Sequence, residues 1–527
     1  SSGINAEYMG SERTWSMIEN DQCWLKPLRK DYFPILEISF NHSQPSSLKK
    51  CFAYCSIFPK NFRLRNDVLI QLWMALSLLG SNETEDEGER YFNILCRNSM
   101  FHDVRKVEHV VRKVQHDVTT AIFFTCHMHD LVHDLAQHVF GKHCLMEDVS
   151  KVNDVPPTVL HLRLTGGCFK TIPKSCRECF QKLDTLYLQC DFSIDVLNGL
   201  KHLHVLILSN RKTNHLPNTI GKLKYLRYID ISKTSFETLP DSIFDLYLLQ
   251  MLRVNFLIDI SEKFKRLKKL RHLYFHDIDR SKGCVFLGIS ALSELQSLSL
   301  FVVSKTKRCL LEELGGLNNL TSELCIYGLE DVNNKDEVKR AMLDNKSKIS
   351  SLRFNWKHRL GDHDEHNDED VLECLTPHSN LKRLFIQNFK GKRFASWMMG
   401  VNPSSTILRN LLELRLWNCH ECECVPPLGH LHFLEELDIR GLSNVKCIEM
   451  EFYGLDGASC NNGVFPSLKM LSIINLQKLQ EWIEVVERND LNIFPCLELL
   501  RIEEWNVEKS TQSFPIPRRI SYYGRWG

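Results

Sequence analysis

The chain has 527 residues, with 66 Lys and Arg against 65 Asp and Glu. Because the two signs nearly balance, the overall charge does not indicate binding to nucleic acid or to a membrane surface. Hydrophobic residues make up 43% of the chain, which suits a folded, soluble protein. No apolar run reaches the roughly 18 residues that a transmembrane helix needs.

The cysteines and the first residues indicate where the protein works. The 20 cysteines are scattered and form no disulfide framework, so we expect a reducing, cytoplasmic location. Residues 1–30 contain no secretory signal sequence and do not begin with Met. We therefore expect a fragment, whose residues 1–30 are the end of an upstream linker or helical subdomain.

A small helical unit is predicted next, over residues 31–150. Apolar residues at helical spacing predict three helices, in 45–58, 66–79 and 87–101. Asn66 is the candidate N-cap of the second helix. A β-like run in 119–130 then leads into a fourth helix. Helices followed by a strand pair around an insertion describe a winged-helix unit.

The insertion contains a duplication. "VRKVEHV" (104–110) is followed at once by the similar "VRKVQHD" (111–117). The two copies could form a basic strip for an acidic partner. We favour an expanded wing, because lengthening a surface hairpin costs little free energy.

The segment "CHMHDLVHDLAQHV" (126–139) is rich in His and Asp. On a helix starting near His127, one gapless apolar stripe is expected, formed by Met128, Leu131, Val132, Leu135, Ala136, Val139 and Phe140. The polar residues on the opposite side are His129, Asp130, His133, Asp134 and Gln137. This polar face could be solvated or could face another domain. Alternatively, His129 and His133 at i, i+4 could chelate a metal in a His/Asp metalloenzyme, but the rest of the chain does not offer the further ligands.

From about residue 159 the pattern L-x-x-L-x-L dominates the chain. It recurs at 159–164, 183–188, 203–208, 226–231, 249–254, 270–275, 295–300, 349–354, 381–386, 411–416, 434–439, 468–473 and 497–502, with a weaker copy at 324–326. This is the signature of leucine-rich repeats, about 14 in number. The sequence predicts an α+β chain: a winged-helix unit followed by a curved α/β repeat solenoid over 151–510. Residues 511–527 are expected to form an irregular tail.

The residues between the leucines should project from the concave face of the solenoid. Those that suit a protein interface are Tyr187, Arg227, Tyr228, Arg253, Arg271, Tyr274, Arg353, Arg383, Arg415 and Trp417. They could instead be ordinary solvated strand positions. A basic, aromatic strip could also meet nucleic acid, but the balanced charge favours a protein partner.

Other metal-like patterns have simpler explanations. The pairs Cys176/Cys179 and Cys419/Cys422 lie far apart, inside repeats whose leucine pattern already explains them. The acidic run 361–370 lacks the ligand and glycine spacing of a hard-cation loop, so a solvated loop is expected. We expect no metal site and no catalytic residues.

Several segments of the chain resemble one known family. "LKKCFAYCSIFPKNFRLRNDVLIQLWMA" (48–75) resembles the winged-helix segment of plant intracellular disease-resistance receptors of the coiled-coil, nucleotide-binding, leucine-rich-repeat class. "MHDLVHDLAQ" (128–137) resembles their Met-His-Asp motif, and 371–398 and 422–454 resemble their repeats. One departure is "MALSLL" (74–79), where the family has Glu-Gly after Met-Ala.

The resemblance implies an ADP/ATP-dependent switch. His129 would contact the ADP phosphates, with Met128 and Asp130 as motif neighbours and the Asp130 carboxylate capping helix amides. The family's phosphate-binding loop is absent from this sequence, because Gly141-Lys142, Gly221-Lys222 and Gly391-Lys392 lack the following Ser or Thr. We therefore expect the C-terminal part of such a receptor, which is not an enzyme and binds no cofactor alone.

The resemblance also implies partners. The upstream nucleotide-binding domain would contact the winged-helix unit, and a pathogen effector or guarded host protein would bind the concave face and trigger defence. Oligomerisation on activation stays open. The alternative is a repeat adaptor, such as a substrate receptor of a ubiquitin ligase, that binds proteins without nucleotide switching.

Overall fold

The computed structural model describes residues 45–80, 84–114, 117–209, 215–236, 238–255, 262–275, 287–306, 308–332, 334–357, 367–399, 407–454, 464–482, 493–503 and 521–523. The predicted subdomain at 1–30 lies outside these residues. The chain divides into two compact units, Ser1–Ile258 with Phe275–Asp279, and Asp259–Tyr274 with Arg280–Gly527.

The first unit begins with the predicted winged-helix elements. Its helices are α3 (Ser46–Tyr54), α4 (Asn66–Ala75), α5 (Glu85–Arg97) and α6 (Asp130–Phe140). Helix α5 begins where the Thr84 side chain accepts a hydrogen bond from the Glu87 N–H, as an N-cap residue does. Leu48, Leu95 and Leu135, from three of these helices, have no exposed surface. Burying each such leucine stabilises the unit by about 1.5–3 kcal/mol.

The start of α4 differs from the prediction. Asn66 is the first helical residue, and Arg65 occupies the N-cap position. The short strand β1 (Leu64–Arg65) pairs antiparallel with β3 (Asp117–His127) just before the helix. This pairing places Asn66 beside β3, where its Oδ1 accepts the Phe124 N–H at 3.1 Å. The Asn66 side chain therefore ties the helix to the sheet and does not cap it.

The duplicated segment forms a long hairpin, as predicted. Strand β2 (His102–Val114) pairs antiparallel with β3 over most of its length. Val110 pairs with Thr120 and Arg112 with Thr119, so Val111 is an extra residue in β2. Such an insertion is a β-bulge.

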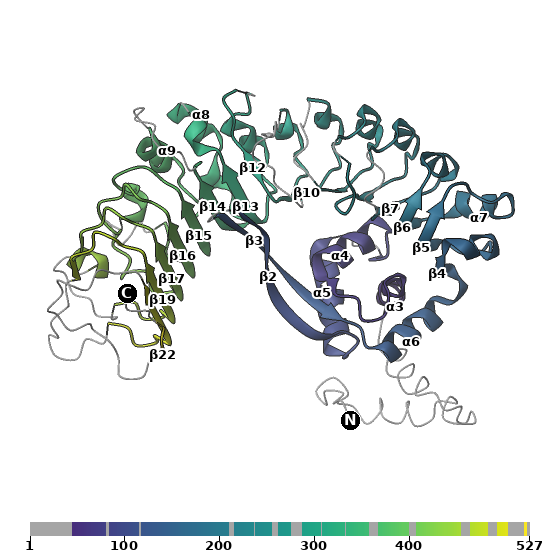
Figure 1. The fold of residues 1–527 in the computed structure, drawn as a ribbon, viewed down its shortest axis with the longest axis horizontal. Coiled ribbons are helices and arrows are strands. Elements are labelled where there is room, and N and C mark those ends of the chain that lie inside the picture. Colours follow the sequence, from purple (N-terminus) through teal and green to yellow (C-terminus); the bar gives the residue numbers. More distant parts are fainter. Residues whose placement is uncertain are drawn as a thin grey trace. The chain divides into compact units, whose positions relative to one another are not determined.

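Leucine-rich repeats complete the first unit, and each predicted leucine segment contains a strand. The strands are β5 (His161–Phe169), β6 (Thr185–Phe192), β7 (Val205–Leu208), β8 (Tyr228–Asp230) and β9 (Met251–Val254), paired in parallel. Strand β4 (Cys144–Asp148) pairs parallel with β5. The sheet thus begins inside the range predicted for the winged-helix unit. Turns of 3₁₀ helix such as η7 (Asn218–Lys222) form the opposite layer (Figure 1).

The second unit continues the same architecture. Strands β10 (His272–Phe275) and β11 (Ser297–Leu298) pair in parallel. A nine-stranded parallel sheet follows, with β12 (Phe301–Val302), β13 (Ser322–Tyr327), β14 (Ile349–Asn355), β15 (Arg383–Gln387), β16 (Glu413–Trp417), β17 (Glu436–Arg440), β19 (Met470–Ile474), β21 (Leu499–Glu503) and β22 (Ser521–Tyr523). Leucines such as Leu352, Leu384 and Leu414 stack in register across it and are buried.

Two elements of the second unit were not expected. Strand β22 lies in the predicted irregular tail and pairs parallel with β21, so this part of the prediction was wrong. The short run Ser521–Tyr523 adds to the open edge of β21, where unpaired N–H and C=O groups are available. Strand β18 (Cys447–Ile448) pairs with β20 (Glu481–Trp482) in a separate small sheet. Within the described residues, no helix is both long and apolar enough to cross a membrane.

Candidate functional site

The Met-His-Asp segment lies at the start of α6. The helix begins at Asp130, and His129 is its N-cap residue, whose Nδ1 accepts the Leu131 N–H at 3.2 Å. Because Nδ1 is an acceptor, the proton of the neutral ring is on Nε2. His129 is exposed. Its Nε2–H is thus available as a donor to a group outside the helix.

The motif neighbours hold this arrangement in different ways. Met128 is buried, with 3% of its surface exposed, and anchors the chain just before the helix. Asp130 was expected to cap helix amides, but the cap is the His129 ring. One Asp130 carboxylate oxygen, Oδ1, is buried without a hydrogen-bond partner among the described residues.

The polar face predicted for this helix was wrong at His133. That residue is buried, and its Nε2 lies 2.7 Å from the Phe58 carbonyl oxygen. Conversely, Leu131 of the predicted stripe is 41% exposed. The inward arc of α6 is centred on Val132, Leu135 and Ala136, and His133 lies beside Ala136 at the edge of this arc.

The structure separates the two histidines of the metal-chelation hypothesis. His129 is exposed while His133 is buried and bonded to a carbonyl, so the two do not form a chelating pair. Among the described residues, no three His, Cys, Asp or Glu side chains are placed to hold a metal ion. The thiols of Cys176 and Cys422 instead donate to main-chain carbonyls, each at 3.2 Å. Residues 361–366 of the acidic run lie outside the described residues.

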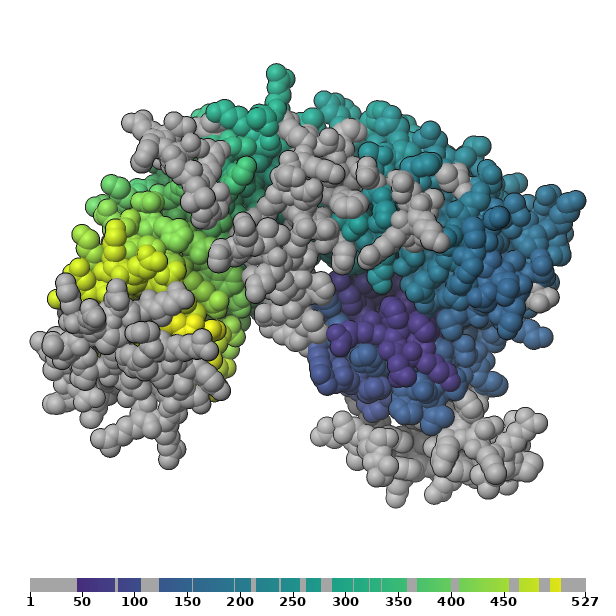
Figure 2. All heavy atoms as spheres, in the orientation of Figure 1, coloured from purple at the N-terminus to yellow at the C-terminus, as the bar shows by residue number. Residues whose placement is uncertain are grey.

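The winged-helix unit packs against the first repeats within the first unit (Figure 2). An aromatic cluster forms one part of this contact. The His161 ring of β5 lies 5.3 Å from the Tyr54 ring and 5.1 Å from the Phe140 ring, between centroids. His161 Nδ1 is 3.0 Å from the Thr185 hydroxyl, and the Tyr54 hydroxyl is 3.4 Å from the same oxygen. Burial lowers the pKa of His161 to about 4.

Charged side chains form a second part of the contact. The Asp67 carboxylate on α4 accepts two hydrogen bonds from Arg65, at 2.9 and 2.6 Å, and lies 3.4 Å from Arg253 Nη2 on β9. Burial alone would raise the pKa of Asp67, but the two guanidinium groups hold it below its usual range. In addition, Arg163 donates to the Ile57 carbonyl and Arg227 to the Ser77 hydroxyl.

Four predicted partner-binding residues therefore lie at this internal contact. Arg227 and Arg253 bond to the winged-helix unit as described. Tyr228 has no exposed surface, and burial raises its pKa well above its usual value. Tyr187 is 4% exposed and lies under Arg163, whose guanidinium carbon is 4.5 Å from the ring centroid. Tyr187, Tyr228 and Arg253 are thus buried while the winged-helix unit is in place, whereas Arg227 stays half-exposed.

The other predicted residues belong to the second unit. On β14 to β17, arginines alternate with aromatic rings across neighbouring strands. Phe385 has Arg353 at 4.3 Å and Arg415 at 5.1 Å from its ring centroid, and Trp417 has Arg440 at 4.9 Å. Arg383, Arg415 and Trp417 are half-buried. So are Arg271 and Tyr274, whose ring stacks on His272.

Comparisons with known proteins identify these parts. Residues 57–136 match the disease resistance protein winged-helix domain, 162–285 a leucine-rich repeat region, and 311–442 the R13L1/DRL21 leucine-rich repeats. The putative disease resistance protein RGA1 of Solanum bulbocastanum is 30% identical over 498 residues, which cover 92% of this chain and 45% of the relative. The chain belongs to the plant disease resistance proteins.

Other members of this family match equally broadly. Disease resistance protein RGA2 of Solanum bulbocastanum is 31% identical over 94% of this chain and 47% of its own length. The putative disease resistance protein At3g14460 of Arabidopsis thaliana is 30% identical over 89% of this chain and 33% of its own length. The chain thus spans less than half the length of these relatives. The matched domains are a winged helix and repeats, which are not catalytic domains.

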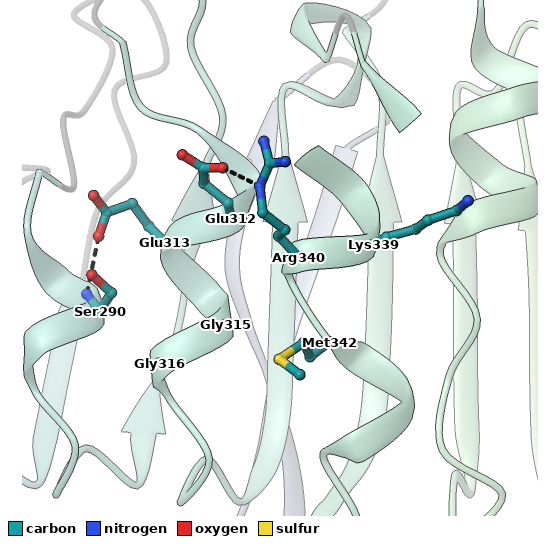
Figure 3. Close-up of a pocket in the computed structure, with 8 residues that line it drawn as sticks. All are labelled: Ser290, Glu312, Glu313, Gly315, Gly316, Lys339, Arg340 and Met342. Carbon is teal, nitrogen blue, oxygen red and sulfur yellow. Dashed lines mark hydrogen bonds and ion pairs between the residues drawn. The ribbon is translucent and has the colours of Figure 1, made fainter. Parts of the chain in front are cut away.

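A shallow hollow on the outer layer of the second unit is a further feature of this disease resistance protein. Figure 3 shows its lining, in which Glu313 accepts from Ser290 and Glu312 pairs with Arg340 at 2.6 Å. The Glu313 carboxylate accepts the Ser290 N–H at 3.1 Å and the Gly288 N–H at 3.3 Å. These side chains join neighbouring repeats of the solenoid.

The sequence did not reveal the polar contacts at Asp67, Arg163 and His161. Each lies at an ordinary helix or strand position with no motif around it. The only available signal was the location of Arg163 and His161 between the leucines of the first repeat, which places them on the concave face. That position does not say whether the chain's own winged-helix unit or another protein covers it.

Proposed function

We propose that the chain is the switch-and-sensor part of a plant intracellular immune receptor. The winged-helix unit would report the nucleotide state of an upstream nucleotide-binding domain, and the repeats would recognise a pathogen effector or a guarded host protein. The observation that carries this proposal is the position of His129 at the start of α6 in a disease resistance winged-helix domain.

The chemistry of His129 suits a contact with ADP. Its Nδ1 is engaged by the helix, so the ring is held in one orientation with Nε2–H directed outward. An imidazole N–H can donate to a phosphate oxygen, and the first turn of a helix favours a negative charge. ADP bound to the upstream domain would then hold the winged-helix unit closed, and its exchange would release the unit.

The repeats would have two tasks. The first repeats hold the winged-helix unit through the Asp67–Arg253 pair and the His161 cluster. The proposed sensor surface is therefore on the second unit, where Arg383, Arg415 and Trp417 are half-buried on the strand face. Arginine and tryptophan are frequent anchors of protein interfaces.

The test joins this chain to the nucleotide-binding domain of its own transcript. We expect the joined protein to retain ADP through purification, and His129→Ala to lower ADP affinity by about ten-fold, which is the loss of one charge-assisted hydrogen bond. His138→Ala, at an exposed position near the other end of α6, is the matched control and should leave ADP affinity unchanged.

Unchanged ADP affinity in the His129→Ala protein would refute the sensor role. A protein that binds its partner through the second unit but never retains ADP would favour the alternative function, a repeat adaptor without nucleotide switching. In that case Arg415→Ala and Trp417→Ala should still weaken partner binding, which separates the two functions.

A further inference from the structure

Two other histidines lie beside His129. His102 on β2 and His127 on β3 are paired in the antiparallel register, and their ring centroids are 6.1 Å apart. The His102 ring also lies 6.3 Å from the His129 ring, edge to face. His102 is exposed and His127 is half-buried. The base of the hairpin thus gathers three imidazoles at the start of α6.

The spacing of these rings suits one phosphate group better than a metal ion. A metal needs its ligand nitrogens within about 2.0–2.1 Å, which draws imidazoles closer together than these are. A phosphate accepts N–H bonds of about 2.7–2.9 Å on several oxygens at once. Two imidazoles at the observed separations can therefore donate to different oxygens of one phosphate.

The charges around the three rings leave them available. On β2, Asp103 and Arg105 form an ion pair with each other at 2.6 Å. On β3, the neighbouring Cys126 is buried. On α6, Asp134 pairs with Lys60, and His133 bonds to the Phe58 carbonyl. Next to His129 in sequence, Asp130 has its Oδ1 buried.

We propose that His102 and His127 extend the His129 contact into a three-imidazole site for a phosphate group. This rests on the proposed function, since the phosphate would be that of a bound nucleoside diphosphate. Three rings would hold the phosphate more firmly than His129 alone, and so would favour the nucleotide-bound, closed state of the receptor.

The test uses this chain with its histidine rings labelled with ¹³C, and inorganic pyrophosphate, ADP and adenosine as probes. Variants His102→Gln, His127→Gln and His129→Gln assign the three signals, and His202→Gln, exposed in another repeat, is the control. We expect pyrophosphate and ADP to shift all three signals and adenosine to shift none.

His102→Gln should weaken pyrophosphate binding about ten-fold, the loss of one hydrogen bond to an anion, while leaving a weaker response at His129. If only the His129 signal responds, the proposed contact of His129 stands and the three-imidazole site is overturned. Unchanged pyrophosphate affinity in His102→Gln, or no response of any of the three rings, would also overturn it.

Discussion

The buried His161 makes the attachment of the winged-helix unit to the first repeats dependent on pH. Its ring lies between Tyr54, Phe140 and Thr185, and burial lowers its pKa from 6.5 to about 4. The nearby Asp184 opposes this shift, whereas His143 and His204 add to it. When the winged-helix unit detaches, His161 is exposed to water and its pKa returns toward 6.5.

The sign and size of the effect follow from these two pKa values. The detached state takes up a proton as the pH falls below 6.5, but the attached state does not until about 4. The attached state is therefore fully favoured above 6.5 and loses stability as the pH falls toward 4. Between about pH 7.5 and pH 5 the loss is about 2 kcal/mol, or about a thirty-fold change in the ratio of the two states.

Hydrogen exchange of the α3 amides measures this equilibrium, because α3 carries Tyr54 into the contact. After correction for intrinsic exchange rates, protection should fall by about thirty-fold between about pH 7.5 and pH 5. His161→Phe keeps an aromatic ring in the cluster but cannot titrate, so its protection should not change with pH. His202→Gln should behave as the wild type. A wild-type protein whose α3 protection is the same at both pH values would refute the reasoning.

Three further outcomes are expected. A double-mutant cycle of Asp67→Asn and Arg253→Gln, measured by urea unfolding of the chain, should give a coupling free energy of about 0.5–3 kcal/mol. If the effects of the two substitutions on the unfolding free energy are additive, the pair does not interact. Leu135→Ala, at a fully buried site of α6, should lower the unfolding free energy by about 2–5 kcal/mol, whereas Leu131→Ala, at a 41% exposed site, should change it by less than about 0.5 kcal/mol. Burial lowers the pKa of Lys346 from 10.5 to about 8, so the unfolded chain holds this proton between about pH 8 and 10.5 and the folded chain does not. The unfolding free energy of the second unit should therefore rise as the pH is raised from about 8 to 10.5. The rise should vanish in Lys346→Met, and a rise that persists in this variant contradicts the assignment.

The repeat architecture was predictable because it depends on local sequence. Each leucine segment buries its apolar residues against the neighbouring copies, so spacing alone identified the strands. Strand β22 escaped prediction because Ser521–Tyr523 carries no leucine pattern and pairs only through its backbone. The hairpin was predictable from its duplication, because a repeated surface segment can lengthen a hairpin at little cost in free energy.

The candidate site was only partly predictable. The Met-His-Asp motif located His129, but apolar periodicity assigns polar residues to the outer face, so it missed that His133 is buried with the Phe58 carbonyl as its partner. The attachment of the winged-helix unit was hidden for a more general reason. Outward strand positions such as Arg253 look the same in sequence whether they face water, another protein or the same chain.

The bulge at Val111 has a consequence for how the hairpin could have grown. A strand alternates with a period of two, so copying seven residues, an odd number, would put the second copy out of phase with the first. The extra residue corrects this phase: Arg105 pairs with Thr125 and its counterpart Arg112 with Thr119, both odd-numbered positions of β3. The copied residues and the bulged residue together advance the pairing by an even number of positions along β3. A hairpin of this kind can be lengthened by one copying event and still keep its register, whereas deleting Val111 alone would invert the alternation of everything beyond it.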